Sequence, residues 1–201
     1  MTARLLVAPA GYGKTRYAID RIRAIKASEP LAPTMVILPN QVRVAEFRDR
    51  LAASGGALGI DLATFHTLYA ELLIRIGEPK ARLTDPVQVR LLRVVVDRLC
   101  DEGRIQHYAP LRGKPGFVAA LRDTIEELKR ARVQPDVFFS RVMGLGPRLE
   151  ELAAIYGAYQ DWLLREEWVD AEGQGWLAAL ALERHSDLGR EIRLLVVNGF
   201  D

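Results

Sequence analysis

The first 76 residues alternate between short apolar runs and segments in which apolar side chains recur at helical spacing. The runs occupy residues 4–8, 35–38 and 60–65. Such alternation is typical of an α/β fold in which parallel strands are joined by right-handed helical crossovers. We expect helices to begin at the end of the first run and to cover residues 42–51 and 66–76. A ligand of such a sheet lies at the carboxyl ends of its strands.

The pattern changes after Gly77-Glu78-Pro79. Residues 86–168 contain no convincing strand, only helical segments at residues 87–100, 116–130, 135–143 and 147–166. The strand pattern returns at residues 192–197. We therefore predict an α/β core made of residues 1–76 and 169–201, incomplete at its C-terminus, with an all-helical insertion at residues 77–168.

Composition narrows the class of protein. The 201 residues are 49% hydrophobic and 27% charged, as expected of a soluble globular domain, and no apolar run is long enough to span a bilayer, so we expect no membrane partner. Cys100 is the only cysteine, which excludes a disulfide framework within the chain and favours a reducing cytoplasm. The net charge of +2 is too small to indicate a nucleic-acid partner by itself.

The first apolar run leads into a glycine-rich turn and then a helix, which is the context of a phosphate-binding P-loop. Gly11 and Gly13 suit a turn whose backbone N–H groups face phosphates, Lys14 suits the outer phosphates, and the Thr15 hydroxyl suits a Mg²⁺ ion carried with the nucleotide. Ala8 stands where the motif has its first glycine. The alternative is a chance glycine-rich connection between a strand and a helix.

Further segments resemble UvrD-like superfamily-one DNA helicases, and more narrowly the N-terminal region of AddB/RexB, the second subunit of a bacterial helicase-nuclease. The helicase-like segments are residues 8–16, 38–41, 64–68, 159–160 and 169–170. The narrower resemblance rests on residues 83–85, 116–117, 127–130 and 197–201. It implies a P-loop RecA-like parallel sheet flanked by helices, with an inserted helical subdomain.

The resemblance also implies ligands, partners and residue roles. The ligands are ATP and Mg²⁺, and the partners are single-stranded DNA or a duplex end and an AddA-type helicase-nuclease subunit, acting in double-strand-break repair in the cytoplasm. Nucleotide-binding positions are expected at Ala10, Gly11, Tyr12, Gly13, Lys14, Thr15 and Arg16. DNA-contacting positions are expected at Thr64, Phe65 and His66, for which the alternative is that Thr64 caps a helix, Phe65 packs in the core and His66 lies on the surface.

Asn198 and Gly199 stand where an active helicase of this class carries adjacent acidic residues. An amide accepts no proton and binds Mg²⁺ more weakly than a carboxylate, so we predict a module that binds ATP but hydrolyses it weakly or not at all. The alternatives are the first motor domain of an active UvrD-type helicase and a small P-loop kinase. Because the sequence stops at Asp201, we expect an N-terminal fragment of a larger protein, and because no lysine follows Pro135-Asp136, we expect no nuclease centre within it.

Overall fold

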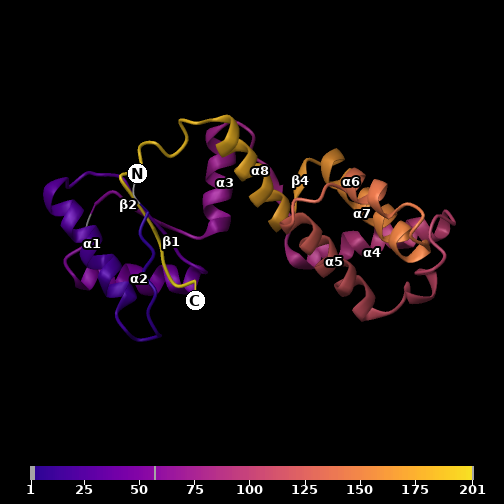
Figure 1. The fold of residues 1–201 in the computed structure, drawn as a ribbon, viewed down its shortest axis with the longest axis horizontal. Coiled ribbons are helices and arrows are strands. Elements are labelled where there is room, and N and C mark those ends of the chain that lie inside the picture. The colour runs from indigo at the N-terminus through magenta and orange to yellow at the C-terminus, as the bar shows by residue number, and fades with distance from the viewer. Residues whose placement is uncertain (1–2, 57, 201) are drawn as a thin grey trace. The chain divides into compact units, whose positions relative to one another are not determined.

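The computed structural model describes residues 3–56 and 58–200 of the chain. Within them the protein is α/β, with eight α-helices and a small parallel sheet. The chain divides into two compact units, one built from residues up to Leu72 together with those from Ala181 onward, the other from Leu73–Leu180 (Figure 1). None of the described helices combines the length and the apolar character needed to cross a bilayer.

The first unit contains a three-stranded parallel sheet. Its central strand is β1 (Thr34–Ile37), flanked by β2 (Ile60–Ala63) and β5 (Leu194–Val197). Val36 is in register with Leu62 on one side and Val196 on the other. All four residues of β1 are buried, as expected of a strand covered on both faces.

Helices α1 (Lys14–Ser28) and α2 (Gln41–Ala53) pack against one face of this sheet (Figure 1). Ile22 of α1 and Phe47 of α2 are almost fully buried there with Val36. The burial of these apolar side chains is the main contribution to the stability of this helix layer on the sheet. Asn40 caps α2 by accepting a 3.0 Å hydrogen bond from the backbone N–H of Arg43.

The opposite face of the sheet is covered by α3 (Phe65–Arg75), whose Phe65 and Leu68 pack against Met35 and Ile37. Thr64 ends the strand segment: its backbone N–H donates to the Thr67 hydroxyl over 2.8 Å, and its own hydroxyl accepts from the Thr67 N–H over 3.3 Å. This pair of bonds satisfies donors at the start of α3.

The strand predicted at residues 4–8 is wrong. Residues 3–9 belong to no strand, and Leu5 and Val7 are 90% and 82% exposed. Apolar β-prone residues form a strand only where a neighbouring edge accepts their backbone hydrogen bonds. Among the described residues, β5 pairs with β1 alone, and residues 3–9 make no ladder with its other edge.

The second unit is mainly helical. Its helices are α4 (Asp85–Asp101), α5 (Pro115–Arg130), α6 (Pro135–Val142) and α7 (Pro147–Arg165), with a short 3-10 turn at Ala109–Leu111. Each of the four α-helices has a proline in its first turn, where the missing N–H leaves no intrahelical bond unmade. Their shared core contains the fully buried side chains of Leu92, Ile125 and Ile155.

Two features of this unit were not predicted. Residues Ala81–Arg82 (β3) and Trp168–Val169 (β4) form a two-residue parallel pair, and α8 (Ala171–Arg184) follows directly. Asp170 lies between β4 and α8, and its Oδ1 accepts a 2.7 Å hydrogen bond from the Gly173 N–H. Asp170 thus caps α8, a role that the glycines in the first turn of that helix obscure in the sequence.

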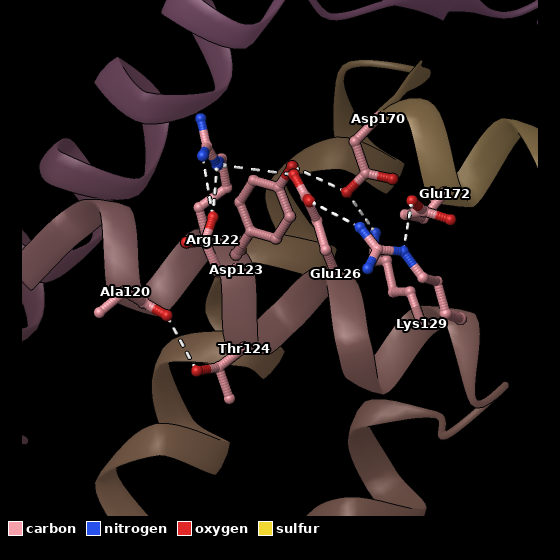
Figure 2. A network of polar contacts seen from close by, with 10 residues as sticks. Ala120, Arg122, Asp123, Thr124, Glu126, Lys129, Asp170 and Glu172 are labelled. Carbon is pink, nitrogen blue, oxygen red and sulfur yellow. Dashed lines mark hydrogen bonds and ion pairs between the residues drawn. The ribbon is translucent and has the colours of Figure 1, made fainter. Parts of the chain in front are cut away.

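The same aspartate joins α5, α7 and α8. Its Oδ2 accepts hydrogen bonds from Lys129 Nζ at 2.6 Å and from the Tyr159 hydroxyl at 2.9 Å. Figure 2 shows the Lys129–Asp170 pair beside a separate chain of ionic contacts, in which Glu126 contacts Arg122 and Arg130, and Arg130 contacts Glu172. The Lys129 and Asp170 side chains are both 2% exposed, so this is a buried ion pair whose charges depend on each other.

Candidate functional site

The glycine-rich loop of the first unit adopts a conformation that depends on glycine. Gly11 and Gly13 both have φ of +82°, a left-handed conformation that other residues rarely adopt. Gly13 directly precedes α1, and its carbonyl accepts the first helical bond, from Tyr17 N–H over 2.9 Å. No side chain caps this helix and its first turn contains no acidic residue, which leaves the positive end of the helix dipole for an anion.

This loop forms one wall of a cavity of about 490 Å³. The other walls are the segment after β1, one face of α2 and the segment after β5, so the cavity lies at the carboxyl ends of the strands, as the α/β pattern predicts. The lining residues are Ala10, Gly11, Gly13, Lys14, Thr15, Arg16, Leu38, Arg43, Glu46, Phe47, Arg50, Asn198 and Gly199.

Most of the predicted nucleotide-binding residues line this cavity. The exception is Tyr12, which is 77% exposed and outside the lining. Lys14 Nζ donates a 2.6 Å hydrogen bond to the Ala8 carbonyl, which holds the ammonium group against the loop. The Arg16 side chain is 88% exposed, and its Nε is 3.9 Å from Asp20 Oδ2.

The end of β5 meets the start of α1 inside the cavity. Asn198 Nδ2 donates a 3.4 Å hydrogen bond to Thr15 Oγ1. Gly199 has φ of +86°, and a Cβ added there would lie 3.4 Å from Pro39 Cδ. A side chain at position 199 therefore requires both a strained backbone and a shift of Pro39.

Sequence inspection missed the polar side chains of α2. The helix was predicted from its apolar positions, whereas Arg43, Glu46 and Arg50 lie at i, i+3 and i+7 and face the cavity. Arg43 and Glu46 form a 2.8 Å ion pair. The sequence contained a signal for these residues. Three charged residues recur at helical spacing directly after a predicted strand, and the ends of the strands were predicted to border a ligand.

The donor set offers little to a Mg²⁺ ion. Thr15 supplies one hydroxyl, Asn198 presents an amide donor toward that hydroxyl, and the only carboxylate that lines the cavity, within the described residues, is that of Glu46. Mg²⁺ prefers an octahedron of oxygen ligands with one or two carboxylates. Nor do residues 3–56 and 58–200 hold a group of three or more His, Cys, Asp or Glu side chains placed to bind a metal.

The predicted DNA-contacting segment lies after β2. Thr64 is 6% exposed and engaged with Thr67, while His66 is exposed. Phe65 packs on the sheet, and its ring centroid lies 5.8 Å from that of Tyr69 and 5.3 Å from that of Phe200. The segment therefore combines a helix cap at Thr64 with a group of aromatic rings around Phe65, so it has features of both of the predicted roles.

Comparisons with known proteins cover nearly the whole chain. A family model described as "ADDB, N-terminal" matches residues 5–201. The chain is similar to proteins named as the B subunit of an ATP-dependent helicase/deoxyribonuclease. The relative from Moorella thermoacetica is 32% identical over 81% of this chain and 15% of its own length, and that from Symbiobacterium thermophilum is 23% identical over 98% and 18%. The chain thus spans about one sixth of the length of these relatives.

Proposed function

The chain belongs to the family of AddB N-terminal regions, and we propose that it is the ATP-binding, DNA-engaging module of a helicase-nuclease subunit that acts in double-strand-break repair. Its first unit is then a RecA-like core, incomplete at its C-terminus, into which the helical segment is inserted. The proposed partners are DNA and an AddA-type subunit, and the proposed location is the cytoplasm, where chromosomal DNA is repaired.

One observation carries the nucleotide part of the proposal. The glycine loop, the uncapped start of α1 and the ends of two strands border a single cavity in which Lys14 and Thr15 are both lining residues. Backbone N–H groups at a helix start favour phosphate, and a lysine beside them adds the charge that a polyphosphate requires. This supports ATP as the ligand that the names of the relatives suggest.

The end of β5 supports a binding role over turnover. In the helicases that this chain resembles, a carboxylate activates the water that attacks ATP, and neither Asn198 nor Gly199 provides one. The alternative, the first motor domain of an active UvrD-type helicase, requires an acidic pair at this place. We therefore propose that hydrolysis by this chain is weak or absent.

The test is isothermal titration calorimetry of the 201-residue chain with ATP and MgCl₂. Lys14→Ala removes one charge-assisted phosphate contact, so we expect its Kd to rise about tenfold or more. The matched control is Lys114→Ala, an exposed lysine of the helical unit, which leaves the Kd unchanged. Equal Kd values for the two variants would overturn the proposal that the loop binds ATP. ATP turnover that depends on Lys14 would overturn the proposal that hydrolysis is weak or absent.

The DNA part rests on the aromatic group after β2 and β5. The Phe65 ring contacts those of Tyr69 and Phe200, Phe200 is 49% exposed, and the exposed His66 lies edge-on to Tyr69 with 6.4 Å between the ring centroids. Exposed rings offer stacking surfaces to unpaired bases. Fluorescence anisotropy with a labelled single-stranded oligonucleotide is expected to show weaker binding by Phe200→Ala and unchanged binding by Tyr12→Ala, an exposed ring of the phosphate loop.

A further inference from the structure

The cavity beside the phosphate loop is strongly basic. Lys14, Arg16, Arg43 and Arg50 line it, against the single carboxylate of Glu46 among the described lining residues. A concave surface with this excess of positive charge attracts an anion of several charges. ATP without a metal is such an anion.

The arginines on α2 are held toward the cavity by the packing of that helix. Phe47 is 2% exposed, packs against the sheet and also lines the cavity. Its burial fixes the rotation of α2 about its own axis, so that Arg43 and Arg50 face the cavity. These two residues are seven positions apart and therefore lie two turns apart on one side of the helix. The Asn40 cap anchors the first turn of α2 at Arg43.

The two guanidinium groups differ in their present partners. Arg43 Nη1 is 2.8 Å from Glu46 Oε2, in a pair whose side chains are 59% and 45% exposed. Arg50 has no ion-pair partner in the part of the chain that the structure describes. An exposed pair contributes little to stability, so a phosphate can replace Glu46 as the partner of Arg43 at little cost.

The side chains that would bind a metal beside the nucleotide are poor Mg²⁺ ligands in this cavity. Asn198 occupies the place beside Thr15, and its amide donates to the Thr15 hydroxyl. A triphosphate bound here must therefore find its counter-charge elsewhere. The α2 arginines supply two positive charges in planar groups that match the oxygens of a phosphate.

We propose that Arg43 and Arg50 neutralise the triphosphate of ATP in place of Mg²⁺, so that the cavity binds ATP without a divalent cation. The inference rests on the proposed function, because it concerns the same cavity. It adds that α2 is part of the nucleotide site and that Mg²⁺ is dispensable for binding.

Calorimetry of the 201-residue chain with ATP in EDTA and with ATP in MgCl₂ tests this. For the unaltered chain we expect Kd values in the two buffers that agree within about threefold, since the arginine charges do not depend on the metal. Arg43→Gln/Arg50→Gln is expected to raise the Kd in EDTA by about tenfold or more, since two charge-assisted contacts are lost. Arg48→Gln, on the same helix but outside the cavity lining, is the control and leaves both Kd values unchanged.

The outcomes separate the two proposals. Binding in MgCl₂ but not in EDTA overturns the inference and leaves the proposed function intact, whereas no binding in either buffer overturns the proposed function and the inference with it. Unchanged EDTA binding by the double variant, with circular dichroism confirming its fold, removes the arginines from the site.

A last arm distinguishes the source of the phosphate. Tripolyphosphate is expected to compete with ATP in EDTA, because the arginines face the phosphate chain. Displacement of ATP by a short single-stranded oligonucleotide at lower concentration than tripolyphosphate would assign the arginines to the DNA backbone and overturn the inference.

Discussion

Asn198 Nδ2 lies 3.4 Å from Thr15 Oγ1, which joins the residue after β5 to the second residue of α1 across 183 positions of sequence. The contact places an amide, not a carboxylate, next to the hydroxyl that a P-loop offers to Mg²⁺. The chemistry of the cavity therefore depends on the residue at position 198.

Asn198→Asp is predicted to make nucleotide binding depend on Mg²⁺. A carboxylate beside Thr15 supplies an oxygen ligand for the metal, and in its absence the added negative charge repels the phosphates. Calorimetry is expected to show about tenfold or more tighter ATP binding in MgCl₂ than in EDTA, as for a charge-assisted contact.

Asn198→Ala is the control, because it removes the hydrogen bond to Thr15 without adding a metal ligand. We expect its two Kd values to remain similar to each other. Equal binding by Asn198→Asp in both buffers would contradict the assignment of position 198 to the phosphate end of the cavity.

Asp170→Ala is predicted to destabilise the helical unit strongly. The substitution leaves Lys129 as a buried charge without its partner and removes the acceptor of Tyr159 and Gly173. Breaking a buried pair in this way costs about 3–5 kcal/mol. The free energy of unfolding from urea titration followed by circular dichroism measures the loss.

Lys129→Met is the matched comparison for that change. It removes one of the three donors to Asp170 and keeps the Tyr159 hydroxyl and the Gly173 N–H in place. Burial, followed by the charge of Asp170, raises the pKa of Tyr159, so this hydroxyl remains a donor at neutral pH. We expect Lys129→Met to be less destabilising than Asp170→Ala, and the opposite order would show that the lysine, not the aspartate, is the centre of the network.

Helices α1 to α7 and the strands of the three-stranded sheet were predictable because their signals are local. Prolines in the first turn mark the starts of α4 and α7, and an uninterrupted apolar run marks β1. The apolar run at residues 4–8 carries the same local signal and forms no strand, because strand formation also depends on pairing with another strand, which a local pattern does not encode.

The glycine loop of the candidate site was predictable from its local pattern, whereas Asn198 and Gly199 were expected there only through the family resemblance and the charged residues of α2 were missed. Gly11 and Gly13 stand out in the sequence because a left-handed turn requires them. The contact between Asn198 and Thr15 depends on the pairing of β5 with β1, which no local pattern encodes. Arg50 faces the cavity only because Phe47 fixes the rotation of α2 against the sheet.

Gly157→Ala is predicted to stabilise the helical unit. Gly157 lies inside α7, and a Cβ added there meets nothing within 4 Å, so the change restricts the unfolded chain without a clash. Alanine is favoured over glycine in a helix interior by about 1 kcal/mol. Thermal unfolding is expected to show a higher Tm.

Gly144→Ala serves as the contrasting variant in the same unit. Its surroundings are equally open, but its φ of +82° is a left-handed conformation that alanine adopts only with strain. We expect a lower Tm, and a rise in both variants would show that glycine entropy alone governs these positions.

Glu151 is predicted to make the stability of the helical unit depend on pH. It is 8% exposed, and its carboxylate accepts hydrogen bonds of 2.7, 2.7 and 2.9 Å from the backbone N–H groups of Gln106, His107 and Tyr108. Burial acts to raise the pKa of Glu151, but these hydrogen bonds together outweigh it, so the pKa lies below its ordinary value. A carboxylate whose pKa is lower in the folded than in the unfolded state stabilises the fold above the unfolded value. That contribution disappears as the pH falls through the folded value.

Glu151→Gln isolates this contribution. A glutamine has one acceptor oxygen in place of two, so at neutral pH we expect a loss of about 1–3 kcal/mol, the penalty for a buried donor left without its partner. The difference in unfolding free energy between Glu151→Gln and the unaltered chain, measured by urea titration at a series of pH values, is expected to be constant above the ordinary pKa of glutamate and to shrink below it. Glu127→Gln, at an exposed position on α5, is expected to show no such trend. A difference that stays constant into the acidic range would mean that the three N–H groups are held by the shape of the loop and not by the charge of Glu151.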